Sequence, residues 1–528
     1  MTPGSGRPAV LRNRVFRALL AVQLVNAVAV WIHVVAVQWV LTERGELALV
    51  ISLAPAALAV PFLLLSMPAG VIAGYASRKK LMAGATSTSA VAAGAACVFS
   101  ATGHDQALVM VLSVLLVGIA LVLVGVSWQS LLPETVERAS IPAAAVVDGA
   151  VFNVARALGP LIAGVGLGLA GAVWTFALVA LLSAGCAVAL LASERRDPDR
   201  TAPRRPILPE LAGAVRFIAY SAWTTRLLCQ LVLFGVPSSA LWALISLVAY
   251  DRMGLSSDGF GVIMGLVGAG AVAAAFTLGG LRRRLRVRSF AALGAATYGA
   301  VLLVLGISTS PVVVGVAVLL AGAAWVSVQS TWMSMGHQFF PEWIRPRLIA
   351  VILLVFQGTQ AIGALLWGAA TDALGLQLAL VIAAALLAAS AVSLRVLGLG
   401  AESGIEPVLF AEHGGAVATP PPEGREVGGR AAVEVRYRYE LDDNDDEFVA
   451  AMRQLRRSRL RLGGRDWRLD PEPDRAGVYV ESYVVSGHRA FEEQELNRLT
   501  VPEARLRERV RRSVRRVSGP EFRERARR

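Results

Sequence analysis

Residues 107–132 read ALVMVLSVLLVGIALVLVGVSWQSLL, a run without a single charged side chain. A segment of about 18 apolar residues or more is long enough to cross a bilayer as a helix. The same pattern recurs before and after this run and stops near Leu397. We expect twelve spans, at 15–41, 47–73, 81–102, 107–132, 142–169, 172–192, 227–250, 259–281, 289–308, 311–335, 348–370 and 375–397.

The basic charge of the chain follows these spans. The net charge is +13, although only 17% of the residues are charged and 55% are hydrophobic. Basic residues gather in every second loop, which matches the positive-inside rule and does not indicate a nucleic-acid partner. The only basic residues in the other loops, which we expect to lie outside the cell, are Arg44 and Arg252. We therefore expect a multi-pass protein of a bacterial cell membrane with both termini cytoplasmic, and no cleavable signal in the basic N-terminus.

One long loop, 193–226, divides the body into residues 1–192 and 227–398, with six spans in each half. A weak repeat relates the halves, since Leu132-Pro133-Glu134 follows the fourth span and Phe340-Pro341-Glu342 the tenth. Two related halves around a central cavity are typical of a large class of transporters.

Several motifs together carry a family resemblance. They are Trp31…Trp39, Met67-Pro68-Ala69-Gly70 before Arg78-Lys79-Lys80, Trp128-Gln129…Pro133-Glu134…Pro142-Ala143-Ala144, Phe152-Asn153…Ala155-Arg156…Gly159-Pro160 and Leu241-Trp242-Ala243-Leu244. The chain resembles the major facilitator superfamily, most closely its enterobactin-exporter-like branch, the transmembrane secretion effectors. This resemblance implies an all-α membrane fold of twelve helices in two six-helix halves. Gly159, Pro160 and Gly164 resemble the antiporter motif of the fifth helix, which implies export.

The resemblance also points to a cytoplasmic gate. Its residues here are Arg78, Lys79, Glu134, Arg138, Glu342, Arg345 and Arg347. The Asp-Arg pair that is usual after the second span is replaced by Gly74 and Tyr75, so Glu134 and Glu342 are expected to supply the acidic partners.

Polar residues inside spans need a partner or a cavity. Gln23, Asn26 and His33 share one helical face of the first span. Either they line the pathway or they form hydrogen bonds between helices. His33 is a proton-carrier candidate or a simple hydrogen-bonded residue.

Arg156 lies deep in the fifth span, with Asn153 one turn before it. A permanently charged guanidinium at that depth needs an acceptor. Asp148 is eight residues away, which makes a direct pair doubtful. Arg156 therefore binds an anionic substrate or has a structural partner.

Two later spans carry wider polar and aromatic faces. Trp325, Gln329 and Trp332 share a face of the tenth span, and Gln357, Gln360 and Trp367 share one of the eleventh. Such faces suit a bulky, partly apolar ligand or serve packing.

The body has no Walker motif, so we expect an ion gradient, most simply of protons, to drive transport. We expect no catalytic residues, cofactor or metal site, and the isolated Cys97, Cys186 and Cys229 support neither a disulfide nor a metal site.

The C-terminal part is polar. Residues 399–430 read as a linker, 431–517 as a small α+β domain and 518–528 as a basic tail. Strands are expected at 432–439, 467–469 and 478–485, and helices at 445–460, 490–498 and 506–517, an order typical of a ferredoxin-like domain. It resembles the soluble domain of the same exporter branch, where histidines occur at the positions of Glu492 and Leu496. Self-association or regulation is its expected role.

These patterns favour a proton-coupled exporter of a hydrophobic or amphipathic small molecule, such as a drug, siderophore or secondary metabolite. An uptake carrier of the same fold remains an alternative. A third is a membrane-anchored enzyme with a catalytic C-terminal domain.

Overall fold

The computed structural model describes residues 12–75, 77–103, 106–137, 140–193, 207–341, 343–398, 432–441, 445–492, 494 and 501–524. Among these residues, eleven helices are long and apolar enough to cross a membrane. They are α1 Arg14–Glu43, α2 Ala48–Tyr75, α3 Arg78–Ala101, α4 Ala107–Thr135, α5 Ile141–Ala192, α7 Ala222–Leu247, α8 Ser257–Thr277, α10 Val287–Ile307, α11 Pro311–Phe339, α12 Arg345–Leu374 and α13 Leu376–Leu397. Short helices η3 (Val248–Arg252) and α9 (Gly279–Arg284) follow α7 and α8.

Helix α5 accounts for two of the twelve expected spans. Its 52 residues would measure about 78 Å as one straight helix, more than twice the apolar thickness of a bilayer. Gly171 interrupts it with φ +80° and ψ 177°, a backbone conformation that only glycine adopts readily. The glycine divides α5 into two helices, residues 141–170 and 172–192, each long enough to cross a membrane, and the predicted all-α membrane fold is confirmed.

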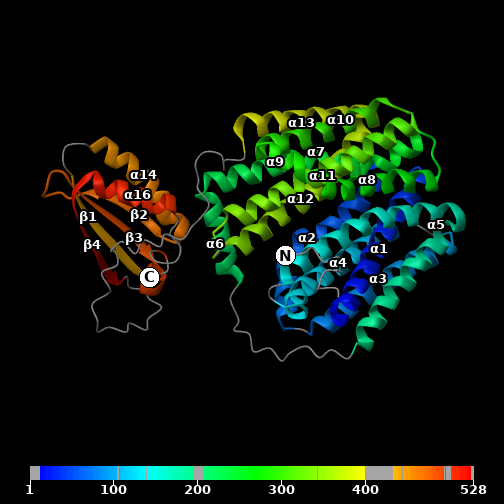
Figure 1. Cartoon of the computed structure of the whole chain (residues 1–528), viewed down its shortest axis with the longest axis horizontal. Helices are drawn as coiled ribbons and strands as arrows, with labels where there is room; N and C mark the ends of the chain where they lie inside the picture. The colour runs from blue at the N-terminus through cyan, green and yellow to red at the C-terminus, as the bar shows by residue number, and fades with distance from the viewer. Residues whose placement is uncertain are drawn as a thin grey trace, which may run out of the picture. The chain divides into compact units, whose positions relative to one another are not determined.

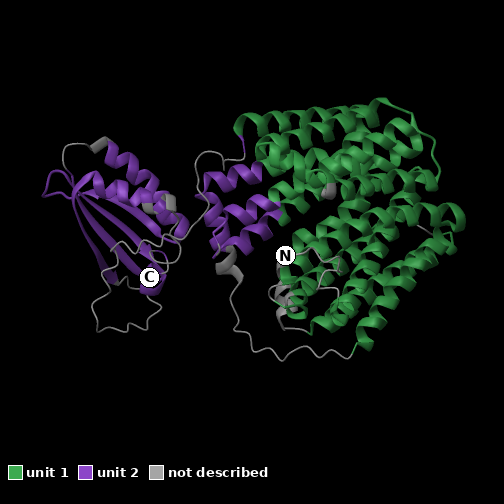
Figure 2. Ribbon diagram, in the orientation of Figure 1, with its two compact units in different colours: residues 1–203, 230–332, 353–397 green, residues 204–229, 333–352, 398–528 purple. Residues whose placement is uncertain are grey.

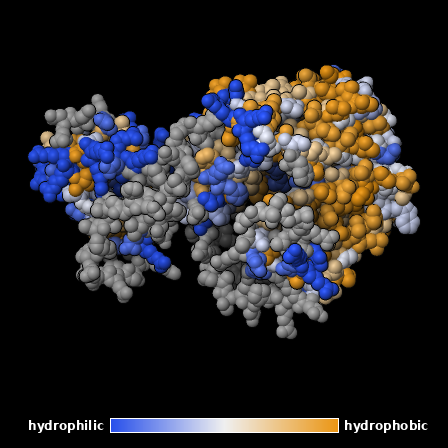
Figure 3. All heavy atoms as spheres, in the orientation of Figure 1, coloured by the Kyte–Doolittle hydropathy of each residue, from blue (hydrophilic) through white to orange (hydrophobic). Residues whose placement is uncertain are grey.

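The membrane helices form two groups. Helices α1–α5 (blue to teal) lie together, and α7–α13 (green to yellow) form the second group beside them (Figure 1). Most of both groups belong to one compact unit, residues 1–203, 230–332 and 353–397 (Figure 2). The face of these helices in view is largely apolar, as contact with lipid tails requires (Figure 3).

Small residues bring the two groups together along α5 and α8. A Cβ atom added to Gly164 would lie 2.4 Å from the Cα atom of Gly261, and one added to Gly268 would lie 2.2 Å from the Cα atom of Ala157. The backbones therefore nearly touch, which maximises dispersion contacts where no hydrophobic effect drives association. We call this contact the α5–α8 seam.

The second compact unit comprises residues 204–229, 333–352 and 398–528. It contains α6 (Ile207–Ala219), a helix that lies within the predicted central loop. Phe217 of α6 contacts Trp343 at 6.0 Å between ring centroids, and the Arg461 guanidinium lies 5.7 Å from the Phe217 ring. Because Arg461 belongs to the C-terminal domain, α6 connects that domain with the chain before α12.

The C-terminal domain is a four-stranded antiparallel sheet covered by helices. Its elements are β1 Val433–Leu441, α14 Asp445–Leu462, β2 Arg465–Pro471, β3 Val478–Val485, α15 His488–Glu492, α16 Val501–Arg512 and β4 Val514–Glu524. The strand order is β2-β3-β1-β4. Alternate residues of β1 are buried against α14 and α16, as the predicted ferredoxin-like pattern requires.

Strand β4 corrects two sequence predictions. The helix expected at 506–517 ends at Arg512, and the region expected to be a basic tail from residue 518 belongs to the sheet through Glu524. The register of β4 against β1 shifts between Arg436 and Arg438 and again between Glu440 and Leu441. These bulges break the strict alternation that marks a strand in sequence.

The linker that the sequence predicts at 399–430 lies outside the described residues.

A buried carboxylate orders the core of this domain. Glu481 has no exposed surface and accepts hydrogen bonds from the Tyr439 hydroxyl at 2.8 Å, Trp467 Nε1 at 2.8 Å and Arg459 Nε at 3.3 Å. Burial first, and then the charge of Glu481, raises the pKa of Tyr439 well above its usual range. Tyr439 therefore stays protonated and remains a donor to Glu481.

Candidate substrate site

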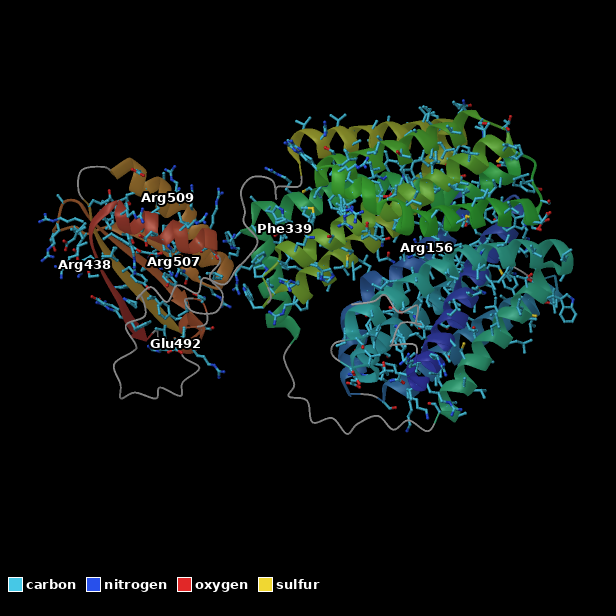
Figure 4. All side chains as sticks on the ribbon, in the orientation of Figure 1. Arg156, Phe339, Arg438, Glu492, Arg507 and Arg509 are labelled. Atoms are coloured by element: carbon cyan, nitrogen blue, oxygen red, sulfur yellow. The ribbon has the colours of Figure 1, made fainter. Side chains whose placement is uncertain are left out.

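Arg156 lies among aromatic rings where the two helix groups meet (Figure 4). It stands midway along the first part of α5, about 22 Å from the start of the helix at Ile141. Its guanidinium carbon lies 5.5 Å from the ring of Trp31, 5.2 Å from that of Phe152 and 6.0 Å from that of Trp242. Trp31 belongs to α1 and Trp242 to α7, so the site is built from both halves.

The aromatic cluster continues into the second half. Trp242 contacts Trp31 at 5.9 Å and Trp325 at 5.8 Å between ring centroids. Trp325 in turn contacts Tyr298 at 5.9 Å and Phe356 at 5.3 Å. Aromatic side chains offer large apolar faces with polar edges, so this cluster suits a ligand with a flat, apolar body.

Three buried donors without partners lie in the same cluster. Among the described residues, Arg156 Nε, Trp242 Nε1 and Trp325 Nε1 are buried and form no hydrogen bond. Trp325 as a whole is only 5% exposed. A buried donor left unpaired costs free energy, and such exceptions in a native fold call for a ligand, water or ion as partner.

The first helix divides its expected pathway residues between two roles. His33 is fully buried and forms a hydrogen bond of 2.9 Å with Ser113 Oγ of α4, within its own half. This geometry supports the hydrogen-bonding interpretation. Gln23 Oε1 and Asn26 Nδ2 are buried and, among the described residues, have no hydrogen-bond partner, so both remain pathway candidates.

The other expected pathway residues differ in their contacts. Asn153 Nδ2 donates to the Gly149 carbonyl of its own helix at 2.9 Å. Gln360 Nε2 donates to the Gly235 carbonyl at 3.1 Å and thereby fastens α12 to α7. Gln329 and Gln357 are half-buried. Gln360 therefore joins two helices by a hydrogen bond in this structure.

Asp148 forms its hydrogen bonds with residues other than Arg156. Its two carboxylate oxygens accept hydrogen bonds from Trp128 Nε1 at 2.7 Å and Gln129 Nε2 at 3.2 Å. This agrees with the expectation that Asp148 and Arg156 do not pair directly.

The antiporter-type motif forms close helix contacts. A Cβ atom on Gly159 would lie 2.4 Å from Cβ of Trp31, so this glycine lets α1 approach α5 beside Arg156. Pro160 is buried one residue later, and Gly164 belongs to the α5–α8 seam. The motif thus positions both the aromatic cluster and the contact between the halves.

Hydrogen bonds join the halves at the end of the bundle whose loops hold only Arg44 and Arg252, here called the Arg-poor end. Gln38 Nε2 donates to the Trp242 carbonyl at 2.8 Å, and Thr42 Oγ1 donates to Ser246 Oγ at 2.9 Å. The Asp372 carboxylate of α12 accepts the backbone N–H groups of Ala48 at 2.8 Å and Leu49 at 2.9 Å. It caps the first turn of α2, where a negative charge is favoured.

The expected gate residues that the structure describes lie at the opposite end of the bundle. Arg78 forms an ion pair of 2.8 Å with Glu134 and donates to the Ser130 carbonyl at 2.8 Å. Lys79 donates to the Ser193 carbonyl. Because α3 and α4 belong to one half, the Arg78–Glu134 pair fastens helices within that half.

The remaining gate residues come from the second half. Arg345 Nε donates to the Phe340 carbonyl at 3.0 Å, and Arg347 is half-buried. Arg138 and Glu342 lie outside the described residues.

Sequence reasoning missed several residues of the site. Trp31 and Trp242 entered only as family motifs, yet they provide two of the three rings around Arg156. The available signal was their place near the middle of spans, since tryptophan is otherwise enriched at membrane interfaces. Asp372 gave a similar signal as a carboxylate at the end of an apolar helix.

Comparisons with known proteins agree with this architecture. The sequence model of the family "Transmembrane secretion effector" matches residues 5–525. The "Multidrug efflux pump Tap" of Mycobacterium tuberculosis (strain ATCC 25618 / H37Rv) is 26% identical over 374 residues, 68% of this chain and 87% of the pump. The same figures hold for Tap of Mycobacterium bovis (strain BCG / Pasteur 1173P2).

Solved structures share the fold of the body. A bacterial homolog of the human lysosomal transporter Spinster, in an inward-facing and occupied conformation, matches with TM-score 0.61 and 13% identity over 74% of this chain and 97% of that one. The nucleoside transporter NupG matches with TM-score 0.56 and 14% identity over 73% of this chain and 99% of that one.

Proposed function

Because this chain belongs to the transmembrane secretion effectors of the major facilitator superfamily, we propose that it exports a small amphipathic molecule by alternating access. Superfamily membership makes it a membrane transporter, and the direction, the substrate class and the driving ion are the proposal. The relative Tap is named as a multidrug efflux pump, which supports export.

The observation that carries the proposal is the aromatic cluster around Arg156. It takes rings from α1, α5, α7 and α11 and so spans both halves of the body. A ligand held there would contact elements that change their relative position during alternating access. Differential binding to two conformations is what allows a ligand to shift their populations.

Two further features fit transport by alternating access across a bacterial cell membrane. The arginine bias indicates that the Arg-poor end faces outward and both termini face the cytoplasm. The halves are hydrogen-bonded at the Arg-poor end, through Gln38, Thr42 and Asp372. This arrangement suits an inward-facing state that loads substrate from the cytoplasm, and a proton gradient is the simplest driving force for its return.

The C-terminal domain is proposed to mediate self-association. One face of its sheet is covered by α14 and α16, while the other carries Glu434, Arg436 and Arg438. Light scattering of the purified full chain tests this proposal. A dimer that dissociates in Arg436→Glu supports it, and a monomeric parent protein contradicts it.

The export proposal is tested by comparing the metabolites of a deletion strain with those of its parent. The substrate should be retained in deletion cells and should reach the medium again when the gene is restored. Restoration with Arg156→Lys should fail while the variant still reaches the membrane. A compound that is depleted in deletion cells would instead favour the uptake carrier, and product formation by the isolated C-terminal domain would favour the enzyme.

A further inference from the structure

We propose that the substrate is an anion, or a molecule with clustered oxygen acceptors, attached to a flat aromatic or conjugated body, and that Arg156 receives its oxygen atoms. This inference rests on the proposed function and specifies the chemical class of ligand. It follows from the charge, the hydrogen-bond capacity and the shape of the cluster.

The positive charge of Arg156 is the first feature that selects a ligand. Among the described residues, Arg156 forms no ion pair and no hydrogen bond; its guanidinium lies over three aromatic rings, and Tyr298 is close enough to interact with it electrostatically. Asp148, the acidic residue within the same span, already accepts two hydrogen bonds from Trp128 and Gln129. A guanidinium deep in a membrane needs a compensating partner, so the site carries a positive charge that a ligand can neutralise.

The aromatic rings around Arg156 are the second feature that selects a ligand. Trp31, Phe152 and Trp242 attract the guanidinium through the negative faces of their π-systems. They accept none of its five N–H groups in a conventional hydrogen bond. The rings therefore hold the cation in place while its edge stays unsatisfied. That is the arrangement in which a planar carboxylate or a pair of oxygens gains two parallel hydrogen bonds.

The unpaired polar atoms of the neighbouring tryptophans are donors as well. Trp242 Nε1 and Trp325 Nε1 are buried without a partner among the described residues, and an indole nitrogen donates only. Tyr298, which contacts Trp325, already donates its hydroxyl to the Ser238 carbonyl at 3.2 Å. A cationic ligand would meet a like charge and these donors, and the ring faces nearest the charge are occupied by Arg156.

The shape of the aromatic surface also favours a flat ligand. Trp325 and Phe356 extend the aromatic surface beyond the rings that hold Arg156, with Tyr298 beside them. Flat rings stack on such faces or meet them edge on. A conjugated ligand would contact this surface while its oxygen atoms face the guanidinium and the indole nitrogens.

Binding of three matched probes to the purified full chain in detergent tests the inference. The probes are 2-naphthoate, the neutral 2-naphthamide and the cationic 2-naphthylmethylammonium, which share one ring system and differ in charge. Binding is followed by the shift in thermal unfolding temperature and by tryptophan fluorescence. We expect 2-naphthoate to bind at least about tenfold more tightly than the ammonium, because hydrogen bonds between charged groups are the strong ones.

Three variants assign this preference to Arg156. Arg156→Gln should abolish it, and Arg156→Lys should keep part of it, because the charge remains while the planar fork is lost. Arg395→Gln removes an exposed arginine near the end of α13 and should behave like the parent. If Arg156→Gln does not fold, as judged by size-exclusion chromatography, Arg156→Lys alone must still weaken 2-naphthoate binding.

An equal or reversed preference in the parent overturns the inference, as does a preference that survives in Arg156→Lys and Arg156→Gln. Absence of binding by all three probes overturns it as well. These measurements involve no transport. A chain that selects 2-naphthoate yet exports nothing from cells would contradict the proposed export and leave the ligand class standing. A chain that exports a cation independently of Arg156 would contradict the ligand class and leave the proposed export standing.

Discussion

At the scale of single residues, buried and half-buried polar side chains in the body fall into two kinds. Asp148 and, through Nε2, His33 have hydrogen-bond partners inside one half and hold helices together, although His33 Nδ1 has no partner among the described residues. Arg156, Trp242 and Trp325 carry buried donors that find no partner among the described residues. Residue type alone does not separate the two kinds, because the difference lies in which helix comes opposite.

The ion pair of Arg78 and Glu134 gives a prediction at this scale. Glu134→Gln removes the charge but keeps the shape, and the side chains are only 8% and 28% exposed. We expect a loss of about 1 kcal/mol of stability, seen as a fall of about 2–4 °C in the thermal unfolding temperature of the purified protein. Glu43→Gln, an exposed glutamate at the Arg-poor end, is the matched control and should leave that temperature unchanged. Equal behaviour of the two variants would contradict a structural role for the pair.

At the scale of helices, the contact between the halves depends on close backbone approach.

The sequence patterns located the membrane helices well, because their long apolar runs depend on composition alone. Strand β4 was missed, because its bulges against β1 hide the alternation. The aromatic cluster was found only in part, since its members come from six different helices and no local pattern connects them.

The cap of α2 by Asp372 predicts a conformational effect. Asp372→Asn removes the negative charge that accepts the N–H groups of Ala48 and Leu49, and loss of such a cap costs about 1 kcal/mol. Spin labels on cysteines at the exposed positions Leu47 and Leu374, in a background without the native cysteines, report the distance across the Arg-poor end. The long-distance population should grow about fivefold.

Asp258→Asn is the control for this experiment. Asp258 lies at the same end but accepts its hydrogen bond from the nearby Ser256. Its variant should leave the distance distribution unchanged. If Asp372→Asn also leaves it unchanged, the carboxylate does not hold the two halves together.

The α5–α8 seam predicts a steric effect on transport. Gly164→Val would force branched carbons against the backbone of Gly261, so the helices must separate at the Arg-poor end. We expect substrate export to fall at least about tenfold while the protein still reaches the membrane, since overpacking costs about 1–3 kcal/mol. Gly149→Ala in the same helix is the control, because a Cβ atom there has nothing within 4 Å. Full activity of Gly164→Val would contradict the need for close approach.

At the scale of the whole molecule, the arginine bias predicts the orientation. A reporter that is active only in the cytoplasm should be active when it is fused after Arg528. The fusion is placed there because β4 continues through Glu524 and must be kept intact. A reporter that is active only outside the cell should be silent at the same position and active when inserted after Gly45, in the loop between α1 and α2. The opposite pattern would reverse the inferred direction of the bundle.

The central claim, gradient-driven export, is tested most directly in inverted membrane vesicles, whose interior corresponds to the outside of the cell. The probe is the compound found to be retained in the deletion strain. With an acidic vesicle interior and no ATP, vesicles that contain the chain should accumulate the compound, and a protonophore or Arg156→Lys should abolish the accumulation. Accumulation that needs ATP, or that occurs only in right-side-out vesicles, would contradict the account.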